Sequence, residues 1–413
     1  MDFGNIRDYD NEIRSIRDWA LRLRRIRPPI KTTWEEPADW VVKDSNLKGK
    51  PATVLIITLT PTGCEWARTG GCTMCGEYEG SAKNNVVSAE FHIAQFSSAI
   101  SKYVAKYKPS WIRIYQEGNY TNIHEVHRSA QKTILRLASI ISGVERITIE
   151  SMAKYISQES ARELRSALAS DVELEVGMGF EAENDVVRNV CVNKGETLDD
   201  YHRALALLKK NGLRSLAYVL LKPAFLSEGE AIDEAIETVK TAYNFGFDAV
   251  SLEPMSIHEF TLVHALSLKG LYTPPWLWSV MKVAKSVHTN KEFRIGGVGY
   301  NPRPINVAHN KCQKEPNCNK ACWNAIRQYN RTRRFEILDT LSCECQKDWE
   351  AECRQVQSPL KERIDSQLAK LSYGEYVNFV RSRETEKSPV LAHALPEIGG
   401  TQYDQRTAES ERT

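Results

Sequence analysis

Short apolar runs rich in β-branched residues recur along the chain from residue 52, and helix-like stretches separate them. The runs begin at residues 52, 110, 144, 174, 214 and 248. Strands that alternate with helices of this length form β-α-β units around a parallel sheet that is buried on both faces. The pattern therefore predicts an α/β fold with a partial (β/α)6 barrel. A doubly wound sheet is the alternative, but the turn after the first strand lacks the G-x-G-x-x-G pattern of a dinucleotide site.

The sequence on either side of this barrel has other patterns. Amphipathic periodicity that ends at two prolines predicts a helical extension over residues 1–50, ahead of a barrel over 51–300. Residues 301–355 contain many cysteines and are expected to form a small metal-binding module. We expect an amphipathic helix within 356–385, and the polar composition of 386–413 predicts a disordered tail.

The composition is that of an ordinary soluble protein, with 42% hydrophobic and 26% charged residues among 413. No apolar run approaches the roughly 20 residues that span a bilayer, and the N-terminus lacks the apolar stretch of a signal peptide. We therefore expect a cytoplasmic protein without membrane contacts. The formal net charge of +2 does not by itself indicate a nucleic-acid partner, and the basic runs at 22–27 and 331–334 are interpreted as solvated helix faces.

Three cysteines lie on a glycine-rich loop directly after the first predicted strand. Cys64, Cys72 and Cys75 have the spacing C-x7-C-x2-C. In reducing cytosol, clustered cysteines bind metal or do chemistry more often than they form disulfides. Three thiolates can ligate three irons of a [4Fe-4S] cluster and leave the fourth iron open to a substrate. The alternative is a zinc site with a distant fourth ligand, because the C-x2-C pair is also a zinc half-site.

The loop at residues 63–76 reads GC-x7-C-x-M-C-G and resembles that of the archaeosine synthase radical subunits. These proteins belong to a narrow group of the radical S-adenosylmethionine superfamily that also includes the radical domain of the elongator acetyltransferase subunit. Residues 179–195 and 218–231 are similar to the motifs of that family after its fourth and fifth strands. The resemblance covers roughly residues 50–350. It implies a [4Fe-4S] cluster and S-adenosylmethionine, whose reductive cleavage gives a 5'-deoxyadenosyl radical.

Polar residues follow the later strands, where the chemistry of such barrels takes place. The candidate cofactor-binding residues are Glu117, Gly118, Asn119, Glu150, Ser151, Glu181 and Arg188, and the candidate catalytic residues are Glu181, Arg188 and Lys222. Glu181 could hold the ribose or ammonium of the cofactor, and Arg188 could pair with its carboxylate; structural ion pairs are the alternative for both. Lys222 is either a substrate-facing cation or a charge at the pocket rim. Glu253 is similarly placed, although a structural role is favoured for it.

Two turns depart from the pattern of the archaeosine family. Residues 116–119 stand where that family has a Ser-Gly-Ser type of turn, and residues 152–153 replace the Arg-Pro that often follows the third strand. Both turns fall at the expected pocket, so the substrate is not specified by the resemblance.

A second group of cysteines follows the barrel. It consists of Cys312, Cys318, Cys322, Cys343 and Cys345, with His309 as a further candidate ligand. This set exceeds the four ligands of a tetrahedral structural zinc, so one or two of its members would be spare. Zn2+ is favoured, and an auxiliary iron-sulfur cluster or free thiols are the alternatives. Cys353 could join the group, whereas Cys191 is expected to be a small buried residue.

The resemblance implies a lyase that acts on a lysine-bearing deazaguanine in tRNA after a separate lysine-transferring enzyme has modified the base. An electron donor such as flavodoxin or ferredoxin would be a further partner. Two other functions stay open, namely a radical enzyme for a small molecule or peptide and a non-catalytic RNA-binding adaptor. The nearly neutral charge is unusual for a protein that binds tRNA, while the complete set of three cluster cysteines argues against the adaptor.

Overall fold

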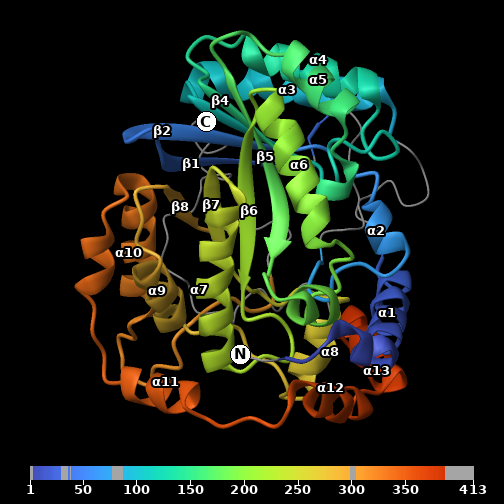
Figure 1. Cartoon of the computed structure of the whole chain (residues 1–413), viewed down its shortest axis with the longest axis vertical. Helices are drawn as coiled ribbons and strands as arrows, with labels where there is room; N and C mark the ends of the chain where they lie inside the picture. The colour runs from blue at the N-terminus through green and yellow to red at the C-terminus, as the bar shows by residue number, and fades with distance from the viewer. Residues whose placement is uncertain (1–2, 29–35, 38, 77–86, 298–303, 387–413) are drawn as a thin grey trace.

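The computed structural model describes residues 3–28, 36–37, 39–76, 87–297 and 304–386. The sheet has eight strands in the order of the chain, and every neighbouring pair is parallel except the first, which is antiparallel (Figure 1). Its strands are β1 (Asp39–Leu47), β2 (Lys50–Thr58), β3 (Trp111–Tyr115), β4 (Arg146–Glu150), β5 (Glu173–Glu181), β6 (Arg214–Leu221), β7 (Ala249–Pro254) and β8 (Glu292–Ile295). The predicted partial α/β barrel is confirmed.

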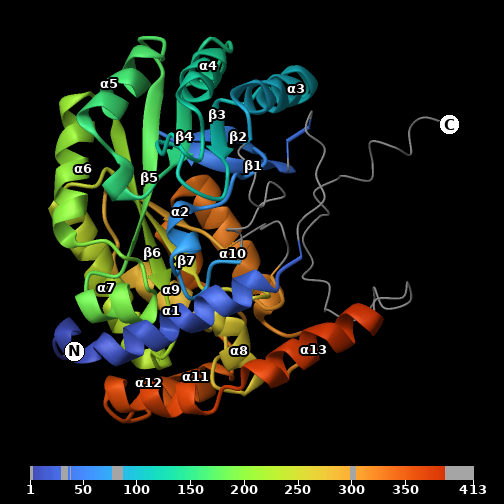
Figure 2. The same ribbon diagram turned by 90° about the vertical axis from the view of Figure 1, so that its right-hand side faces the viewer.

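Helices follow the parallel strands and cover the outer face of the sheet (Figure 1). Capping boxes at Ser157, Thr197 and Ser227 fix where three of these helices begin, because each box satisfies two backbone donors. The covering helices are α3 (Ala89–Tyr107), α4 (Arg128–Ser139), α5 (Gln158–Ser166), α6 (Leu198–Lys210), α7 (Glu228–Phe245) and α9 (Leu277–Ser286). Helix α8 (Leu262–Leu268) lies instead beyond the carboxyl ends of the strands (Figure 2).

The two outer strands of the sheet were not apparent from the sequence pattern. β1 lies within the region that was expected to be a helical extension, and it joins β2 through Lys48 and Gly49, which both have positive φ as a tight hairpin turn requires. β8 has only four residues. Helix α10 (Asn319–Thr332) contacts both β1 and β8, so it lies across the opening between the two ends of the sheet.

Segments from both ends of the chain lie together at the carboxyl ends of the strands (Figure 2). Helix α1 (Asp10–Arg25) packs on α12 (Leu360–Ala369), and Lys361 forms an ion pair of 2.6 Å with Glu12. The C-terminal segment, expected as one helix, forms α12 and α13 (Tyr373–Glu386), which follow α11 (Gln346–Cys353). The predicted tail lies outside the described residues from 387 onward.

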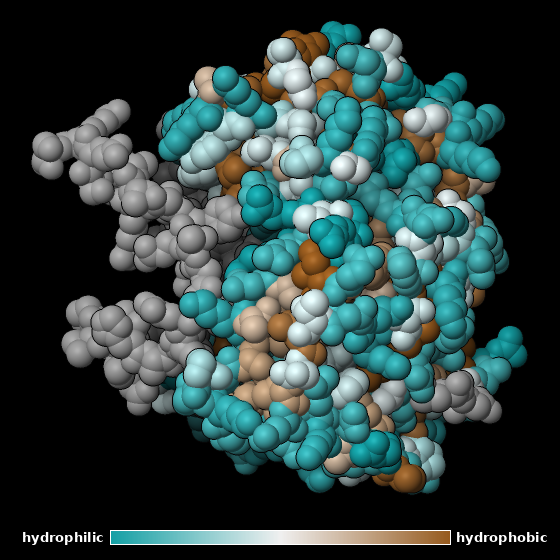
Figure 3. Space-filling view, turned by 90° about the vertical axis from the view of Figure 1, so that its left-hand side faces the viewer, coloured by the Kyte–Doolittle hydropathy of each residue, from teal (hydrophilic) through white to brown (hydrophobic). Residues whose placement is uncertain are grey.

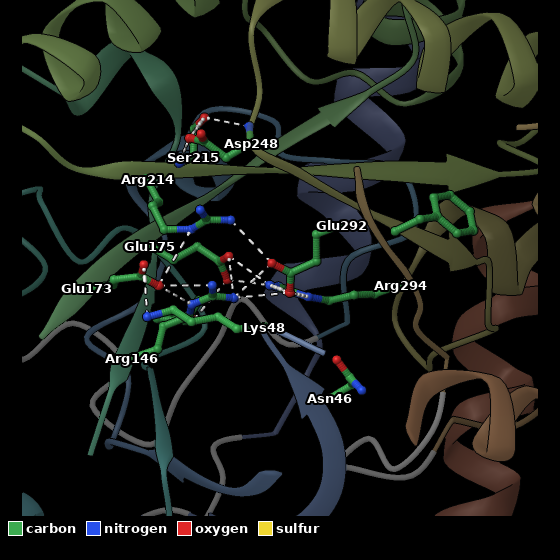
Figure 4. A network of polar contacts seen from close by, with 12 residues as sticks. Asn46, Lys48, Arg146, Glu173, Glu175, Arg214, Ser215, Asp248, Glu292 and Arg294 are labelled. Atoms are coloured by element: carbon green, nitrogen blue, oxygen red, sulfur yellow. Dashed lines mark hydrogen bonds and ion pairs between the residues drawn. The ribbon is translucent and has the colours of Figure 1, made fainter. Parts of the chain in front are cut away.

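An ion-pair network fills the interior of the sheet at the amino ends of the strands (Figure 4). Arg294 donates to both carboxylate oxygens of Glu175 at 2.8 Å, and Arg146 donates to Glu173 and Glu292. Buried charges need such partners, because an unpaired charge in the interior is strongly destabilising. The network occupies this end of the barrel, so any site for a ligand inside the sheet lies toward the carboxyl ends of the strands.

In the part of the chain that the structure describes, no helix combines the length and apolar character needed to cross a bilayer. The face of the molecule in Figure 3 is mainly hydrophilic, with apolar side chains in scattered patches.

Candidate functional site

The loop that carries Cys64, Cys72 and Cys75 extends from the carboxyl end of β2 and includes the short helix α2 (Glu65–Arg68). All three cysteines are half-buried. The backbone of Thr73 is tied to the segment after β5, because its N–H donates to the Val192 carbonyl at 2.9 Å and its hydroxyl donates to the neighbouring carbonyl at 2.7 Å. The loop is thus held at the end of the sheet where the sequence places the chemistry.

Arginines of the basic run at the end of α1 hold the cysteine loop from the outside. Arg24 donates to the carbonyls of Gly70 and Cys72, the second at 2.6 Å, and Arg27 donates to the carbonyl of Gly76. The two side chains are only 3% and 8% exposed. The interpretation of this run as a solvated helix face is therefore wrong for Arg24 and Arg27, because loop carbonyls replace water around their guanidinium groups.

Asn193 holds the same loop from the side of β5. Its side-chain amide donates to the Gly71 carbonyl at 2.7 Å, and its own carbonyl accepts from the Trp66 indole at 2.9 Å. Gly195 has a φ of +69°, and a Cβ there would lie 2.4 Å from the Trp66 ring. The motif at residues 193–195 therefore shapes the cysteine loop, and glycine is required where the indole approaches the backbone.

Glu181 and Lys194 form an ion pair of 3.0 Å beside the loop. A Cβ on Gly179 would lie about 2 Å from both charged groups, so the absence of a side chain there makes room for the pair. Burial raises the pKa of Cys64 to about 11 and that of Cys72 to about 12, and the nearby Lys194 ammonium opposes the rise at Cys72. Of the candidate residues after β5, Glu181 is the one that lies close to the cysteines.

The turn after β3 also reaches the cysteine loop. The Asn119 side-chain amide donates to Cys64 Sγ at 3.6 Å and to Glu125 at 2.7 Å, while its oxygen accepts from the backbone of Met152. A Cβ on Gly118 would lie 2.2 Å from Glu125 Oε2, so only glycine fits there. The structure thus brings Asn119 of the predicted 117–119 turn to the cysteine loop.

Sequence reasoning missed Glu125. Its carboxylate is only 2% exposed and accepts from the backbone N–H groups of Glu65 and Asn119 and from the side chain of Gln116. It thereby joins the turn after β3 to the residue that follows Cys64. In the sequence it stands among the polar residues of a helix-like segment, and no local pattern distinguishes it from a solvated charge.

The side chain of Arg188 is completely buried within its own loop. Its guanidinium donates to the carbonyls of Ala182, Glu183 and Glu196 at 2.9 to 3.1 Å and to the Asp185 carboxylate. These partners shape the turn after β5. The geometry thus corresponds to the structural alternative for Arg188 rather than to a guanidinium presented to a ligand.

Lys222 and Ser151 lie near the strand ends but contact other groups. Lys222 forms an ion pair of 2.7 Å with Glu228 and approaches Glu352 of α11 at 4.0 Å, so it faces the C-terminal helices. The Ser151 hydroxyl shares a hydrogen bond of 2.5 Å with Thr121. Neither of these contacts involves the cysteine loop.

The second group of cysteines forms a compact cluster of four. The Sγ atoms of Cys312, Cys318, Cys343 and Cys345 all lie within 4.8 Å of one another, and two of the pairs are 3.7 and 3.6 Å apart. Cys322, Cys353 and His309 lie outside this group. The His309 ring instead donates to the Val307 carbonyl at 2.8 Å, and the Cys322 thiol accepts from Asn310.

No family model matches the chain. It is 30% identical over 339 residues to archaeosine synthase subunit beta of Methanosarcina acetivorans, covering 81% of this chain and 95% of that protein. It is 31% identical over 315 residues to archaeosine synthase subunit beta of Thermococcus kodakarensis, covering 75% and 94%. A radical SAM methyltransferase from Sphaerobacter thermophilus superposes with a TM-score of 0.40 at 15% identity, covering 69% and 89%. The relatives confirm the resemblance of the chain to this group of proteins, and the chain belongs to the archaeosine synthase beta subunit family.

Proposed function

We propose that the protein binds a [4Fe-4S] cluster through Cys64, Cys72 and Cys75 and uses it to cleave S-adenosylmethionine. The cysteine loop carries the proposal, because it lies at the carboxyl end of a barrel strand and is held from three sides by buried polar contacts. When bound, the cluster supplies the electron that breaks a carbon–sulfur bond of the cofactor and generates a 5'-deoxyadenosyl radical. The protein has to orient the cofactor and exclude water.

The spacing of the thiols supports different metals at the two cysteine groups. A single tetrahedral zinc with bonds of about 2.3 Å brings its sulfurs roughly 3.8 Å apart. Among the described residues, only the C-terminal group brings three or more cysteine thiols within 4.8 Å of one another. The thiolates of a cubane bind separate irons and are therefore more widely spaced, which suits the first loop.

Residues on two sides of the cysteine loop are suited to hold the cofactor. Asn119 lies 3.6 Å from Cys64, and the Glu181–Lys194 pair lies beside Cys72. The carboxylate of Glu181 can accept a hydrogen bond from the ammonium of the cofactor's methionine group, and Lys194 can pair with the carboxylate of that methionine group. The buried Arg24 side chain, which donates to two carbonyls of the loop, closes the outside of the loop and keeps water from it.

The substrate is inferred from the relatives, two of which are named as archaeosine synthase beta subunits. We propose that the protein is a lyase for a lysine-bearing deazaguanine in tRNA, with a lysine-transferring enzyme and an electron donor such as flavodoxin or ferredoxin as partners. The match covers 95% of the length of one of these relatives, so the proposal draws on nearly the whole of that protein.

The radical chemistry is tested with protein reconstituted with iron and sulfide under anaerobic conditions. With dithionite it should convert S-adenosylmethionine into 5'-deoxyadenosine and methionine. Cys72→Ala should abolish this conversion. Cys191→Ala is the matched control, because that cysteine is buried in the core and belongs to neither group. An iron-replete wild-type protein that gives no 5'-deoxyadenosine would contradict the proposal.

The tRNA assignment needs a separate experiment. Purified protein should bind tRNA with an affinity that falls as salt rises, because phosphate contacts release counterions. Lysine-modified tRNA should increase the yield of 5'-deoxyadenosine and lose its lysine side chain. A protein that still cleaves S-adenosylmethionine but does not bind tRNA at any salt concentration would instead favour a small-molecule or peptide substrate.

We also propose that the four C-terminal cysteines bind a structural zinc. The two short S···S distances match a tetrahedral ion, and outer donors complete the site. Asn310 donates to Cys318 Sγ at 3.2 Å and the Trp278 indole donates to Cys345 Sγ at 3.3 Å, as expected for groups that stabilise metal-bound thiolates. The metal would fix the position of α10 across the open side of the barrel.

A further inference from the structure

Four charged side chains meet inside the sheet, one layer below the cysteine loop. They are Lys43 of β1, Arg113 of β3, Glu150 of β4 and Glu253 of β7, and the charges of Arg113 and Glu253 both influence the pKa of Lys43 and that of Glu150. These four residues are referred to below as the interior charge set. Side chains two or four positions apart on a strand share a face. Glu150 therefore faces the interior like Arg146, and the Arg113 guanidinium lies 4.3 Å from the interior Trp111 ring.

Glycines leave room for these groups. A Cβ on Gly296 would lie 1.9 Å from a carboxylate oxygen of Glu253, so that carboxylate occupies the space of the missing side chain. A Cβ on Gly177 would lie 2.7 Å from the Tyr218 ring, which crosses β5 there toward Glu150. The buried Tyr218 hydroxyl faces Glu150 and is close enough to interact with its carboxylate.

The set places two anionic and two cationic side chains close to one another in a buried setting. Burial, reinforced by the Glu253 carboxylate, raises the pKa of Glu150 to about 7. Burial and the Arg113 guanidinium lower the pKa of Lys43 to about 8. Glu150 therefore lies near both Glu253 and Arg113, and Lys43 lies near the same two residues, so a ligand that carries both signs of charge meets a complementary group for each sign.

We infer that the interior charge set binds the ammonium and carboxylate groups of an amino-acid substituent on the substrate. The inference rests on the proposed function. An amino acid attached to a base through its side chain keeps both α-groups free. Glu150 and Glu253, with the Tyr218 hydroxyl, receive the ammonium, and the planar guanidinium of Arg113 forms two hydrogen bonds to the carboxylate.

The position of the set favours the substrate over the cofactor. Glu150 lies beside Gly177 in the sheet. Gly179 is the next residue of β5 on the same face, closer to the carboxyl end of the strand, and it faces the Glu181–Lys194 pair. The methionine group of the cofactor must reach the cluster loop, where that second pair lies. The deeper layer is thus left for a group that extends into the barrel from the reacting carbon.

The experiment measures equilibrium binding by calorimetry, with iron-replete protein and three nucleoside probes. The probes are a deazaguanine nucleoside that carries lysine through its side-chain nitrogen, the same nucleoside without the α-carboxylate, and the same nucleoside without the α-ammonium. Glu253→Gln should weaken binding of the lysine probe about 10- to 100-fold. It should bind the probe without the ammonium as the wild type does, and this equality also shows that the variant is folded.

Arg113→Lys should give the complementary result. It should bind the probes that carry the carboxylate more weakly than the wild type does, and it should bind the probe without the carboxylate as tightly as the wild type does. Glu237→Gln is the matched control, because that carboxylate is exposed on α7. Equal binding of all three probes by the wild type, or an equal loss for all probes in Glu253→Gln, would overturn the inference. Because binding needs no turnover, this outcome is distinct from a failure to cleave S-adenosylmethionine, which would overturn the proposed function.

Discussion

The most direct test of how the cysteine loop is held is Arg24→Gln with Arg25→Gln as its control. The two arginines are neighbours on α1 and both substitutions remove one positive charge. Arg24 is buried against the carbonyls of Gly70 and Cys72, whereas Arg25 is exposed. A general effect of charge or of helix α1 would therefore appear equally in both variants, and only a specific contact would separate them.

The size of the effect follows from the two hydrogen bonds that Arg24 makes. Hydrogen bonds to a charged donor each contribute about 1.5–3 kcal/mol, and their removal leaves buried carbonyl oxygens without a partner. Glutamine can retain one weaker bond, so we expect a loss of about 3 kcal/mol in the free energy that keeps the loop closed. Because about 1.4 kcal/mol corresponds to a factor of ten, the open loop should become roughly 100-fold more populated.

The assay follows the loss of iron-sulfur absorbance after a ferrous chelator is added to reconstituted protein without oxygen. Iron leaves through the open loop, so its rate should rise by up to about 100-fold in Arg24→Gln and stay near the wild-type rate in Arg25→Gln. Equal rates in the two variants would refute the role of Arg24. Iron content before the chelator is added verifies that each variant was loaded to the same extent.

Three further predictions concern other parts of the chain. Elemental analysis should find zinc in the wild type and in Cys191→Ser but not in Cys318→Ser; undiminished zinc in Cys318→Ser would contradict a four-cysteine site. Because burial raises the pKa of Glu150 from 4.5 to about 7, its protonated form favours folding, and this contribution is lost as pH rises from 4.5 to 7. Denaturant unfolding should therefore show a decline of up to about 3 kcal/mol over this range that is absent from Glu150→Gln; parallel curves would disprove it. Gly71→Ala should lower the melting temperature of the iron-free protein more than Gly143→Ala. Both glycines have positive φ, but only a Cβ on Gly71 would lie 2.8 Å from the backbone of α2. Similar shifts in melting temperature would show that the loop can move to accommodate the added Cβ.

The central strands were predictable because each is buried on both faces. Such strands read as continuous apolar runs, and the observed strands β2 to β7 begin within two residues of the six predicted positions. β1 and β8 were missed for the opposite reason. Their inward positions include Lys43, Glu292 and Arg294, whose charges are accommodated only by partners on distant strands. A sequence pattern records hydrophobicity and contains no information on such pairing.

The site was predictable to the extent that its chemistry is local. The cysteines of the first loop stand together in the sequence, and so do the glycines around them. Arg24 and Glu125 contact that loop from segments about 50 residues away on either side, and each looks like an ordinary helix charge in its own segment. Likewise, the sequence shows five cysteines in the second group but not which four converge, because no local pattern distinguishes Cys322 from the other four.

The segments into which the sequence pattern divides the chain do not correspond to the structural units around the cysteine loop. Helix α1 belongs to the predicted extension, yet its arginines hold the cysteine loop of the barrel. Helix α1 is itself held by the C-terminal helices, through the Lys361–Glu12 ion pair and through Tyr373, whose ring lies 4.1 Å from the Arg22 guanidinium. Movement of the C-terminal helices would thus be transmitted to the cysteine loop through helix α1. Helices α1, α12 and α13 thus support the cysteine loop together, and the surroundings of that loop depend on these helices as well as on the barrel.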